Sequence, residues 1–553
     1  MRLRTSLVAV GLAAAITLTG CAAGSGDTDD KADAGASLTI AKPDGPITTE
    51  GNNPWVGDSS ALKLGYANAI YEPLGIVNLA DPSQDVVPWL ASEITWSDDY
   101  TSVQLKAREG VKWNDGKDFT ADDIAFTFNL IKDNKALDTK ALGLSDVAVD
   151  GDVVTLSFES PMFVRQDKVL HIQIVPEHVW KDVEDPTTFS DDDAVGTGPY
   201  SLTSFSSQSV ELTARDDYWG GKPAVPTLYY VSYADNTALT TAMANGDADW
   251  AQAWIPDVQS AFVDKDPDHH VYWPAAGIAI DTMFVNTTAK PFDDLAFRKA
   301  VNMVIDREKH QQIAREDGVP LLTSVTGLAP GAGDAFVSSE FEGQEYKVDV
   351  DGAKKVLEEA GYTWDGDKLV DPSGTPVTFT LSVPQGWNDY VTGISLIADS
   401  VKALGVEATV DTPDQDTWWK AKQEGDFQAV LHWTDDSATP YDLYSDQMDG
   451  RFLKPIGESA DFNFGRFDNA DATAALADYA STTDDAERTA ALDEIEKIYV
   501  DQVPAMPIGT RPSIAEYNTT NYVGWPNEDD PYVPADPTKP WSVIILTKLQ
   551  PAD

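Results

Sequence analysis

The clearest pattern along the chain is a change from alternating to helical spacing of apolar residues. Apolar and polar residues alternate from Val377 to Val383, which predicts a strand. After a loop from Pro384 to Asp389, apolar residues at helical spacing from Val391 to Leu404 predict a helix that ends at Gly405. Val406 to Val410 predicts a second strand. This order is a βαβ unit, so we expect parallel strands with a right-handed crossover.

Two further helices have recognisable ends. Phe297 to Ile305 carries apolar residues at helical spacing behind Asp293 and Asp294, which suit an N-terminal cap. Ala353 to Ala360 predicts another short helix, closed by Gly361. Strand-like runs alternate with helical ones along the rest of the chain, so the predicted class is mixed α/β.

Three predicted strands are followed by a tryptophan. Trp387 lies in the loop after Val383, Trp254 follows a short strand from Ala248 to Ala251, and Trp433 follows a buried strand from Phe427 to Leu431. Ligands of open parallel sheets bind beyond the carboxyl ends of the strands. A single tryptophan in such a place is more often a core residue, but three at equivalent positions make a ligand platform nearly as plausible as a core role.

The amino terminus has the order of a secretory signal. Arg2 and Arg4 precede an uncharged apolar stretch from Leu7 to Leu18, which is too short for a mature membrane span. The stretch ends in Leu18-Thr19-Gly20-Cys21, which resembles the bacterial lipoprotein box. Cys21 is the only cysteine, so no disulfide competes for it. We therefore expect residues 1–20 to be removed and Cys21 to carry a lipid; an ordinary secretory signal is the alternative.

Residues 21–36 have no large apolar side chain and cannot contribute to a core. A flexible coil of this length spans roughly 20 Å, enough to hold a globular body just off a membrane. Nothing later in the chain approaches a transmembrane run. The predicted location is therefore extracytoplasmic, at the cell membrane, through a lipid anchor.

Composition excludes several classes of protein. The chain has 553 residues and is 42% hydrophobic, which is enough for a sizeable core and excludes global disorder. It carries 91 acidic against 39 basic side chains, a net charge of −52. A surface of that sign repels phosphates, so we expect no nucleic-acid partner.

No catalytic motif stands out. The six histidines have no metal-ligand spacing, and neither a nucleophile elbow nor a phosphate-binding loop is present in the sequence. Asp365-Gly366-Asp367 fits a hairpin turn better than a calcium loop. Among so many acidic residues a pair of carboxylates is inevitable and carries no specificity. We therefore expect that the protein is not an enzyme and that it binds neither a metal ion nor a cofactor.

Several motifs together resemble one known family. Leu105 to Asp123, Tyr71 to Leu74, Gly196 to Tyr200 and Pro291 to Asp294 closely resemble the hallmarks of the dipeptide/oligopeptide-binding family (family 5) of ABC-transporter solute-binding proteins. They lie in the family's order across essentially the whole mature chain. We interpret each of them as a marker of the fold and none as a ligand contact.

The resemblance implies the two-lobed periplasmic-binding-protein fold, of the class II, cluster C type, with a hinge between the lobes. Lobe I would comprise residues 37–65, 193–285 and 505–553, with an extra domain, 66–192, inserted in it. Lobe II would be 286–504. Closure of the lobes on a small-molecule solute would signal the loaded state to an ABC permease without chemistry on the solute, and we expect a monomer.

The motifs also bear on the solute. Peptide-binding members have a Gly-Trp-x-x-Asp segment whose acid pairs with the peptide amino group. Trp433 to Asp436 keeps Trp-x-x-Asp, but His432 replaces the glycine. Thr439 to Tyr444, Pro455 to Glu458 and Gly524 to Tyr532 instead resemble the branch that binds cello-oligosaccharides. A β-linked sugar suits flat aromatic rings edged by polar groups.

These arguments predict an oligosaccharide site, with an oligopeptide as the alternative and a surface glycoside hydrolase as a remote one. Trp113, Trp219 and Trp541 are expected in the lobe cores. The candidate ligand residues are Trp433, Trp387, Trp254, Trp55, Trp525, Asp436, Asn388, Gln252 and Asn53.

Overall fold

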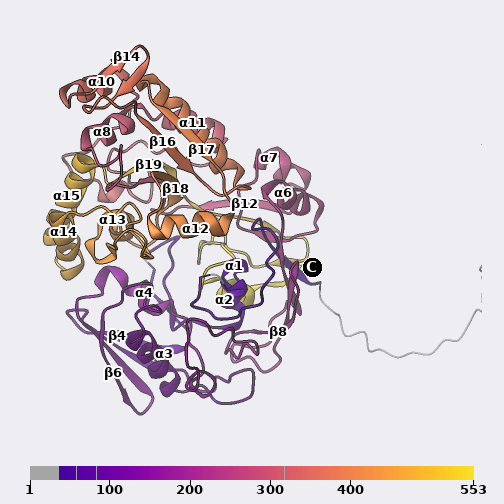
Figure 1. Ribbon diagram of the computed structural model, residues 1–553. Helices are drawn as coiled ribbons and strands as arrows, with labels where there is room; N and C mark the ends of the chain where they lie inside the picture. The colour runs from indigo at the N-terminus through magenta and orange to yellow at the C-terminus, as the bar shows by residue number, and fades with distance from the viewer. Residues whose placement is uncertain (1–35, 58, 83, 317, 553) are drawn as a thin grey trace, which may run out of the picture. The chain divides into compact units, whose positions relative to one another are not determined.

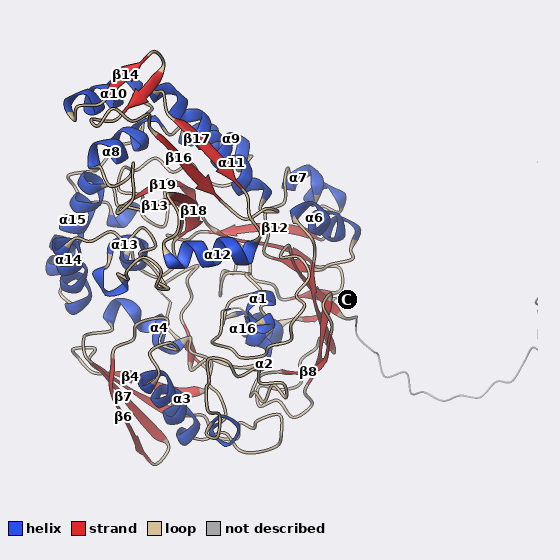
Figure 2. Cartoon of the chain, in the orientation of Figure 1, coloured by secondary structure: helices blue, strands red, loops and turns tan. Residues whose placement is uncertain are grey.

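The structure is a computed structural model that describes residues 36–57, 59–82, 84–316 and 318–552. The predicted signal peptide, Cys21 and nearly all of the predicted tether lie outside the described residues. Within the described part, the strands form three larger sheets and three two-stranded ones (Figures 1 and 2). No helix of this part is long and apolar enough to cross a membrane.

A seven-stranded sheet combines strands from distant parts of the chain. Its core packs α1 (Ser60–Leu64), α2 (Ala67–Ile70) and α16 (Ser542–Lys548) against the strands. The strand order is β12 (His270–Ala275), β20 (Ser513–Asn518), β11 (Trp250–Ala251), β1 (Leu38–Lys42), β10 (Thr227–Ser232), β9 (Ser209–Ala214) and β8 (Tyr200–Phe205).

A five-stranded sheet contains the predicted βαβ unit, which is confirmed. β16 (Thr378–Ser382) and β17 (Glu407–Asp411) are parallel, with Thr378 opposite Glu407, and α11 (Asn388–Val401) connects them. The strand order is β17, β16, β18 (Ala429–Trp433), β13 (Ile280–Val285) and β19 (Ala505–Thr510). Buried residues of α8 (Leu295–Val304), α10 (Val350–Glu359) and α11 complete its core (Figure 2).

Both predicted helices are confirmed, with the expected ends. The side chain of Asp294 accepts a hydrogen bond from the Ala296 N–H and caps α8. Gly361 follows α10 in the left-handed conformation, with φ of 88°. The predicted hairpin turn at Gly366 connects β14 (Thr363–Asp365) and β15 (Lys368–Val370).

A four-stranded antiparallel sheet belongs to the segment predicted as an extra domain. Its order is β4 (Ala91–Trp96), β5 (Ser102–Ala107), β7 (Val153–Phe158) and β6 (Leu144–Asp150). It shares a core with α3 (Ala121–Asp133), whose first turn is fixed by a capping box of Thr120 and Asp123.

The remaining elements are shorter pairs and connecting helices. They are β2 (Gly75–Ile76) with β3 (Val87–Pro88), β21 (Tyr522–Val523) with β22 (Gln550–Pro551), α4 (Gln166–Leu170), α5 (Glu177–Trp180), α6 (Asn236–Asn245), α7 (Val258–Ala261), α9 (Arg307–Ala314), α12 (Gln415–Glu424), α13 (Tyr441–Met448), α14 (Ala470–Ser481) and α15 (Asp485–Gln502).

The chain crosses between the seven- and five-stranded sheets at two places, after β12 and after β19. The two crossings are hydrogen-bonded, since the Arg511 N–H donates to the Ala279 carbonyl over 3.0 Å. The division into two lobes stays a proposal. If each of the two larger sheets belongs to one lobe, the boundaries between the lobes differ from the predicted ones. β13 lies before the predicted edge at 285 and β19 after the one at 504, yet both strands belong to the five-stranded sheet.

Candidate functional site

A cavity of about 490 Å³ is lined by four separate stretches of the chain. Residues between 54 and 79 and between 131 and 173 form one side, and residues between 419 and 464 the other. Lys539, Pro540 and Trp541 complete the wall. This volume lies in the range of roughly 300–1,000 Å³ that is usual for small-molecule sites.

Aromatic rings make up much of the cavity wall. Trp55 packs on Trp180, with ring centroids 5.1 Å apart, and its indole N–H donates to the Gln173 carbonyl over 3.2 Å. Trp541 is 4% exposed and packs edge-on against His171, and its indole nitrogen has no hydrogen-bond partner among the described residues. The aromatic lining residues are Trp55, Trp419, Phe462, Phe464 and Trp541.

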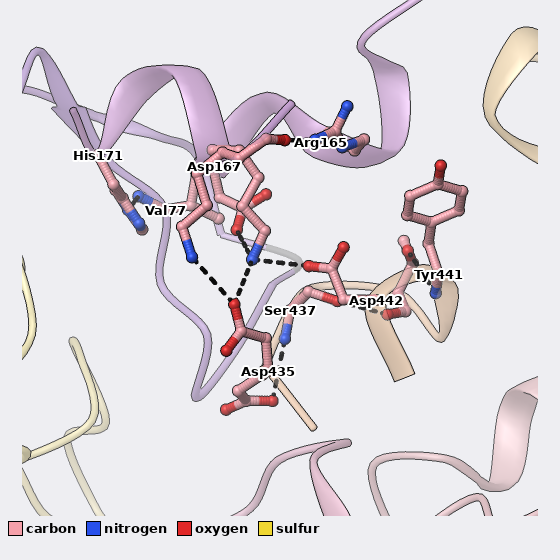
Figure 3. Close-up of polar contacts among 12 residues, drawn as sticks. Val77, Arg165, Asp167, His171, Asp435, Ser437, Tyr441 and Asp442 are labelled. Atoms are coloured by element: carbon pink, nitrogen blue, oxygen red, sulfur yellow. Dashed lines mark hydrogen bonds and ion pairs between the residues drawn. The ribbon is translucent and has the colours of Figure 1, made fainter. Parts of the chain in front are cut away.

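A cluster of lysines and aspartates borders the cavity, and Figure 3 shows the polar contacts around its aspartates Asp167, Asp435 and Asp442. The amine of Lys168, on α4, is 2.7 Å from Asp442, 3.3 Å from Asp167 and 3.9 Å from Asp435. Lys140 lies 3.1 Å from Asp435. The lysines belong to the 66–192 segment, while Asp435 and Asp442 follow β18, so the cluster joins two parts of the chain that are distant in sequence.

The cluster determines the charge state of its members. Burial alone would raise the pKa of Asp435, but Lys140 and Lys168 outweigh it and hold that pKa below its usual range. Burial raises the pKa of Asp442 despite Lys168. Burial, reinforced by Lys168, lowers the pKa of His171 to about 3, and its Nε2 accepts a hydrogen bond from the Val77 N–H over 3.1 Å. His171 is therefore a neutral acceptor in the wall.

The Trp-x-x-Asp segment connects the cavity with the crossing between the two larger sheets. Thr434 exchanges hydrogen bonds with Ile280, and one carboxylate oxygen of Asp436 accepts from the Ile278 N–H over 3.1 Å. A Cβ at Gly277 would come within 2.8 Å of the other oxygen. Burial raises the pKa of Asp436 to about 6. Asp436 therefore contacts both the cavity and the crossing segment.

Comparison of the chain with known proteins identifies the family to which it belongs. The family model for bacterial extracellular solute-binding proteins, family 5 Middle, matches residues 85–451, which is more than half of the chain. The chain belongs to this family. It is a family of solute-binding proteins and not of enzymes, so the hydrolase alternative is not retained.

Individual relatives are distant. The chain is 28% identical to Protein XP55 of Streptomyces lividans, over 60% of each chain. It is 26% identical to the oligopeptide-binding protein AppA of Bacillus subtilis, over 75% of this chain and 76% of AppA. The mannohexaose-bound periplasmic oligopeptide-binding protein of Thermotoga maritima is 23% identical, with a TM-score of 0.84 over 93% of this chain and 98% of the other. This likeness confirms the predicted periplasmic-binding-protein fold.

Two of the predicted ligand residues of this solute-binding protein line the cavity, namely Trp55 and Asp436. Trp387 and Trp433 do not line it but contact each other, with ring centroids 5.5 Å apart. Trp387 also packs on Trp418 of α12, and Trp433 stacks on His432. Asn388 is the first residue of α11, beside Trp387.

The other four predicted ligand residues lie elsewhere. Asn53 is 1% exposed, and its amide donates to the carbonyls of Pro186 and Phe189. Trp525 is buried in the core of the seven-stranded sheet, stacked on Tyr517. Trp254 is also buried, below the guanidinium of Arg315. Gln252 is half-buried next to Ala251 at the end of β11.

Sequence reasoning missed the contribution of α12. Trp419, Lys422 and Gln423 of this helix line the cavity, although no strand end leads to them. The sequence does contain one indication of this wall. Lys422 and Gln423 follow Trp419 by three and four residues, which places the three side chains on one helix face. Trp541, predicted as a core residue, is both buried and part of the wall. Among the described residues, no group of three or more His, Cys, Asp or Glu side chains is placed to hold a metal ion.

Proposed function

We propose that the protein captures an oligosaccharide in this cavity and delivers it to an ABC permease. The composition of the cavity wall carries the proposal. The wall contains five aromatic rings together with lysine, aspartate and glutamine side chains. Sugar rings have apolar C–H faces and hydroxyl edges, which such a lining matches. The mannohexaose bound to the Thermotoga maritima protein supports an oligosaccharide, whereas the nonapeptide bound to Bacillus subtilis AppA supports the alternative solute.

The finer points of the proposal come from the sequence. The motifs similar to the cello-oligosaccharide branch favour a β-linked chain. The lipoprotein box favours attachment to the membrane through Cys21. The lobes would close over the solute by bending at the two crossings, after β12 and after β19.

The proposal is tested by titrating the purified protein with cello-, xylo- and manno-oligosaccharides and with short peptides. A true ligand raises the thermal midpoint in proportion to ln(1 + [L]/Kd) and changes the tryptophan emission. A response to peptides alone would reject the oligosaccharide assignment.

Trp55→Ala is expected to weaken oligosaccharide binding at least tenfold, or about 1.4 kcal/mol, because a ring is lost from the wall. Trp364→Ala is the matched control, since Trp364 is also half-buried but lies in the β14–β15 hairpin. Calorimetric titration measures both. The sequence predicts a loss of binding also for Trp387→Ala and Trp433→Ala, although neither ring lines the cavity. If both variants bind normally, their rings are not part of the site.

One observation favours an oligopeptide as the second candidate. Asp436 lies in the wall with a pKa of about 6, within the Trp-x-x-Asp segment. If it paired with a peptide amino group, affinity would rise between pH 5 and pH 7 as the carboxylate ionises, and acetylation of the peptide would abolish that rise. A neutral oligosaccharide should show no such dependence. Titration of a tripeptide and its acetylated form at several pH values decides between the two solutes.

A further inference from the structure

One face of α12 contributes an aromatic ring and two polar side chains to the cavity wall. Trp419, Lys422 and Gln423 all line the cavity, whereas Trp418 turns away from it and is 1% exposed in the core. The side chain of Gln423 makes no hydrogen bond to another described residue. The helix is therefore held by Trp418 and presents the other three side chains to whatever fills the cavity.

Lys422 is buried, at 1% exposure, and lies among aromatic rings. Its amine is 3.7 Å from the ring centroid of Trp419 and 4.1 Å from that of Phe464. It is also 3.2 Å from Nε2 of His432, whose Nδ1 lies 3.0 Å from the Trp433 carbonyl. Since Nδ1–H donates to that carbonyl, Nε2 is the acceptor for one N–H of Lys422.

The other lysines of the wall differ from Lys422. Lys140 and Lys168 are paired with carboxylates, and Lys539 is exposed. No carboxylate of a described residue forms an ion pair with Lys422. Burial lowers the pKa of Lys422 well below its usual range, and Asp435 and Asp446 only partly offset this effect. A lysine in such a place costs folding energy, which a role in binding would explain.

We propose that Trp419, Lys422 and Gln423 form a subsite for an uncharged, hydroxyl-bearing ring of the solute. The indole of Trp419 would stack on the C–H face of the ring, while the Lys422 amine and the Gln423 amide would hydrogen-bond its hydroxyls. An acidic group is disfavoured, because the five aspartates of the lining outnumber its four lysines, and Lys140 and Lys168 are already paired with carboxylates. The subsite rests on the proposed function and narrows its solute to neutral sugars.

Lys422→Met tests the subsite, because methionine keeps an unbranched side chain against the rings but has no amine. Binding of cellopentaose and of mannohexaose, measured by calorimetry, is expected to weaken about tenfold or more. The thermal midpoint of the free protein is expected to rise, because a buried amine that has no carboxylate partner is removed, and this gain exceeds the loss of its hydrogen bond to His432. A purely structural lysine would give the opposite shift in midpoint.

Lys420→Met is the control, since Lys420 is an exposed residue of the same helix whose amine is 3.6 Å from Glu424. It should change neither affinity nor midpoint. Trp419→Ala provides a second variant and should also weaken binding about tenfold.

The outcomes separate the subsite from the function. If the wild-type protein binds oligosaccharides and the Lys422 and Trp419 variants bind them as tightly, the subsite is overturned while the function stands. Tighter binding of an oligogalacturonate than of both neutral sugars would overturn the preference for an uncharged ring. If the wild-type protein binds none of the sugars, the proposed function fails and the subsite with it.

Discussion

Lys168→Met is expected to lower the stability of the protein by about 3–5 kcal/mol. The Lys168 amine lies within 4 Å of Asp167, Asp435 and Asp442, and its side chain is only 11% exposed. Without the lysine, Asp167 and Asp442 lose the ion pair that Lys168 gives them, while Asp435 keeps its pair with Lys140. The measurement is the thermal midpoint, because a chain with several cores need not unfold in two states.

The pH dependence of this variant gives a second readout. Carboxylates that lose their cation take up protons more readily in the folded than in the unfolded chain, so part of the lost stability should return as the pH falls from 8 to 5. Lys106→Met is the control, since Lys106 pairs with the exposed Glu93 and should change stability by less than about 1 kcal/mol. A decrease no larger than that of the control would contradict the role given to Lys168.

Gly196→Ala is expected to prevent folding or to destabilise the protein by more than about 4 kcal/mol. A Cβ at position 196 would lie against the Ile70 carbonyl oxygen and 2.6 Å from the carbonyl carbon, and neither atom belongs to a flexible side chain. Gly51→Ala is the matched control, because its nearest neighbour, Ser59, would be 3.6 Å away. Soluble yield and thermal midpoint distinguish the two variants. Normal folding of Gly196→Ala would show that the segment can shift.

Local patterns predicted the elements whose periodicity and caps agree. The βαβ unit around α11 was predicted because its helical spacing ends at Gly405, and α8 because its helical spacing follows the cap residue Asp294. The family motifs predicted the overall fold, which the local patterns alone do not specify. They also mark backbone contacts such as Gly196 against Ile70, whose reason becomes visible only in the structure.

The candidate site was predicted less well than the fold, because it depends on distant pairing. Lys140 and Asp435 are 295 residues apart, and no local pattern links them. The rule that ligands bind beyond strand ends led to Trp387 and Trp433, which do not line the cavity; Trp387 packs on Trp418 of α12 and on Trp433. Trp525 follows a glycine and precedes a proline, which suggests a loop, but the ring packs between Trp250 and Tyr517.

The two hydrogen-bonded crossings have a practical consequence. Residues 280–510 leave the seven-stranded sheet and return to it at neighbouring points, since the Arg511 N–H reaches the Ala279 carbonyl over 3.0 Å. The core of the five-stranded sheet is built from side chains within this stretch. The stretch is therefore suited to transplantation as one piece between relatives. Such a chimaera would exchange the wall that contains α12 and Asp436 and would keep Trp55 and Trp541 from the recipient.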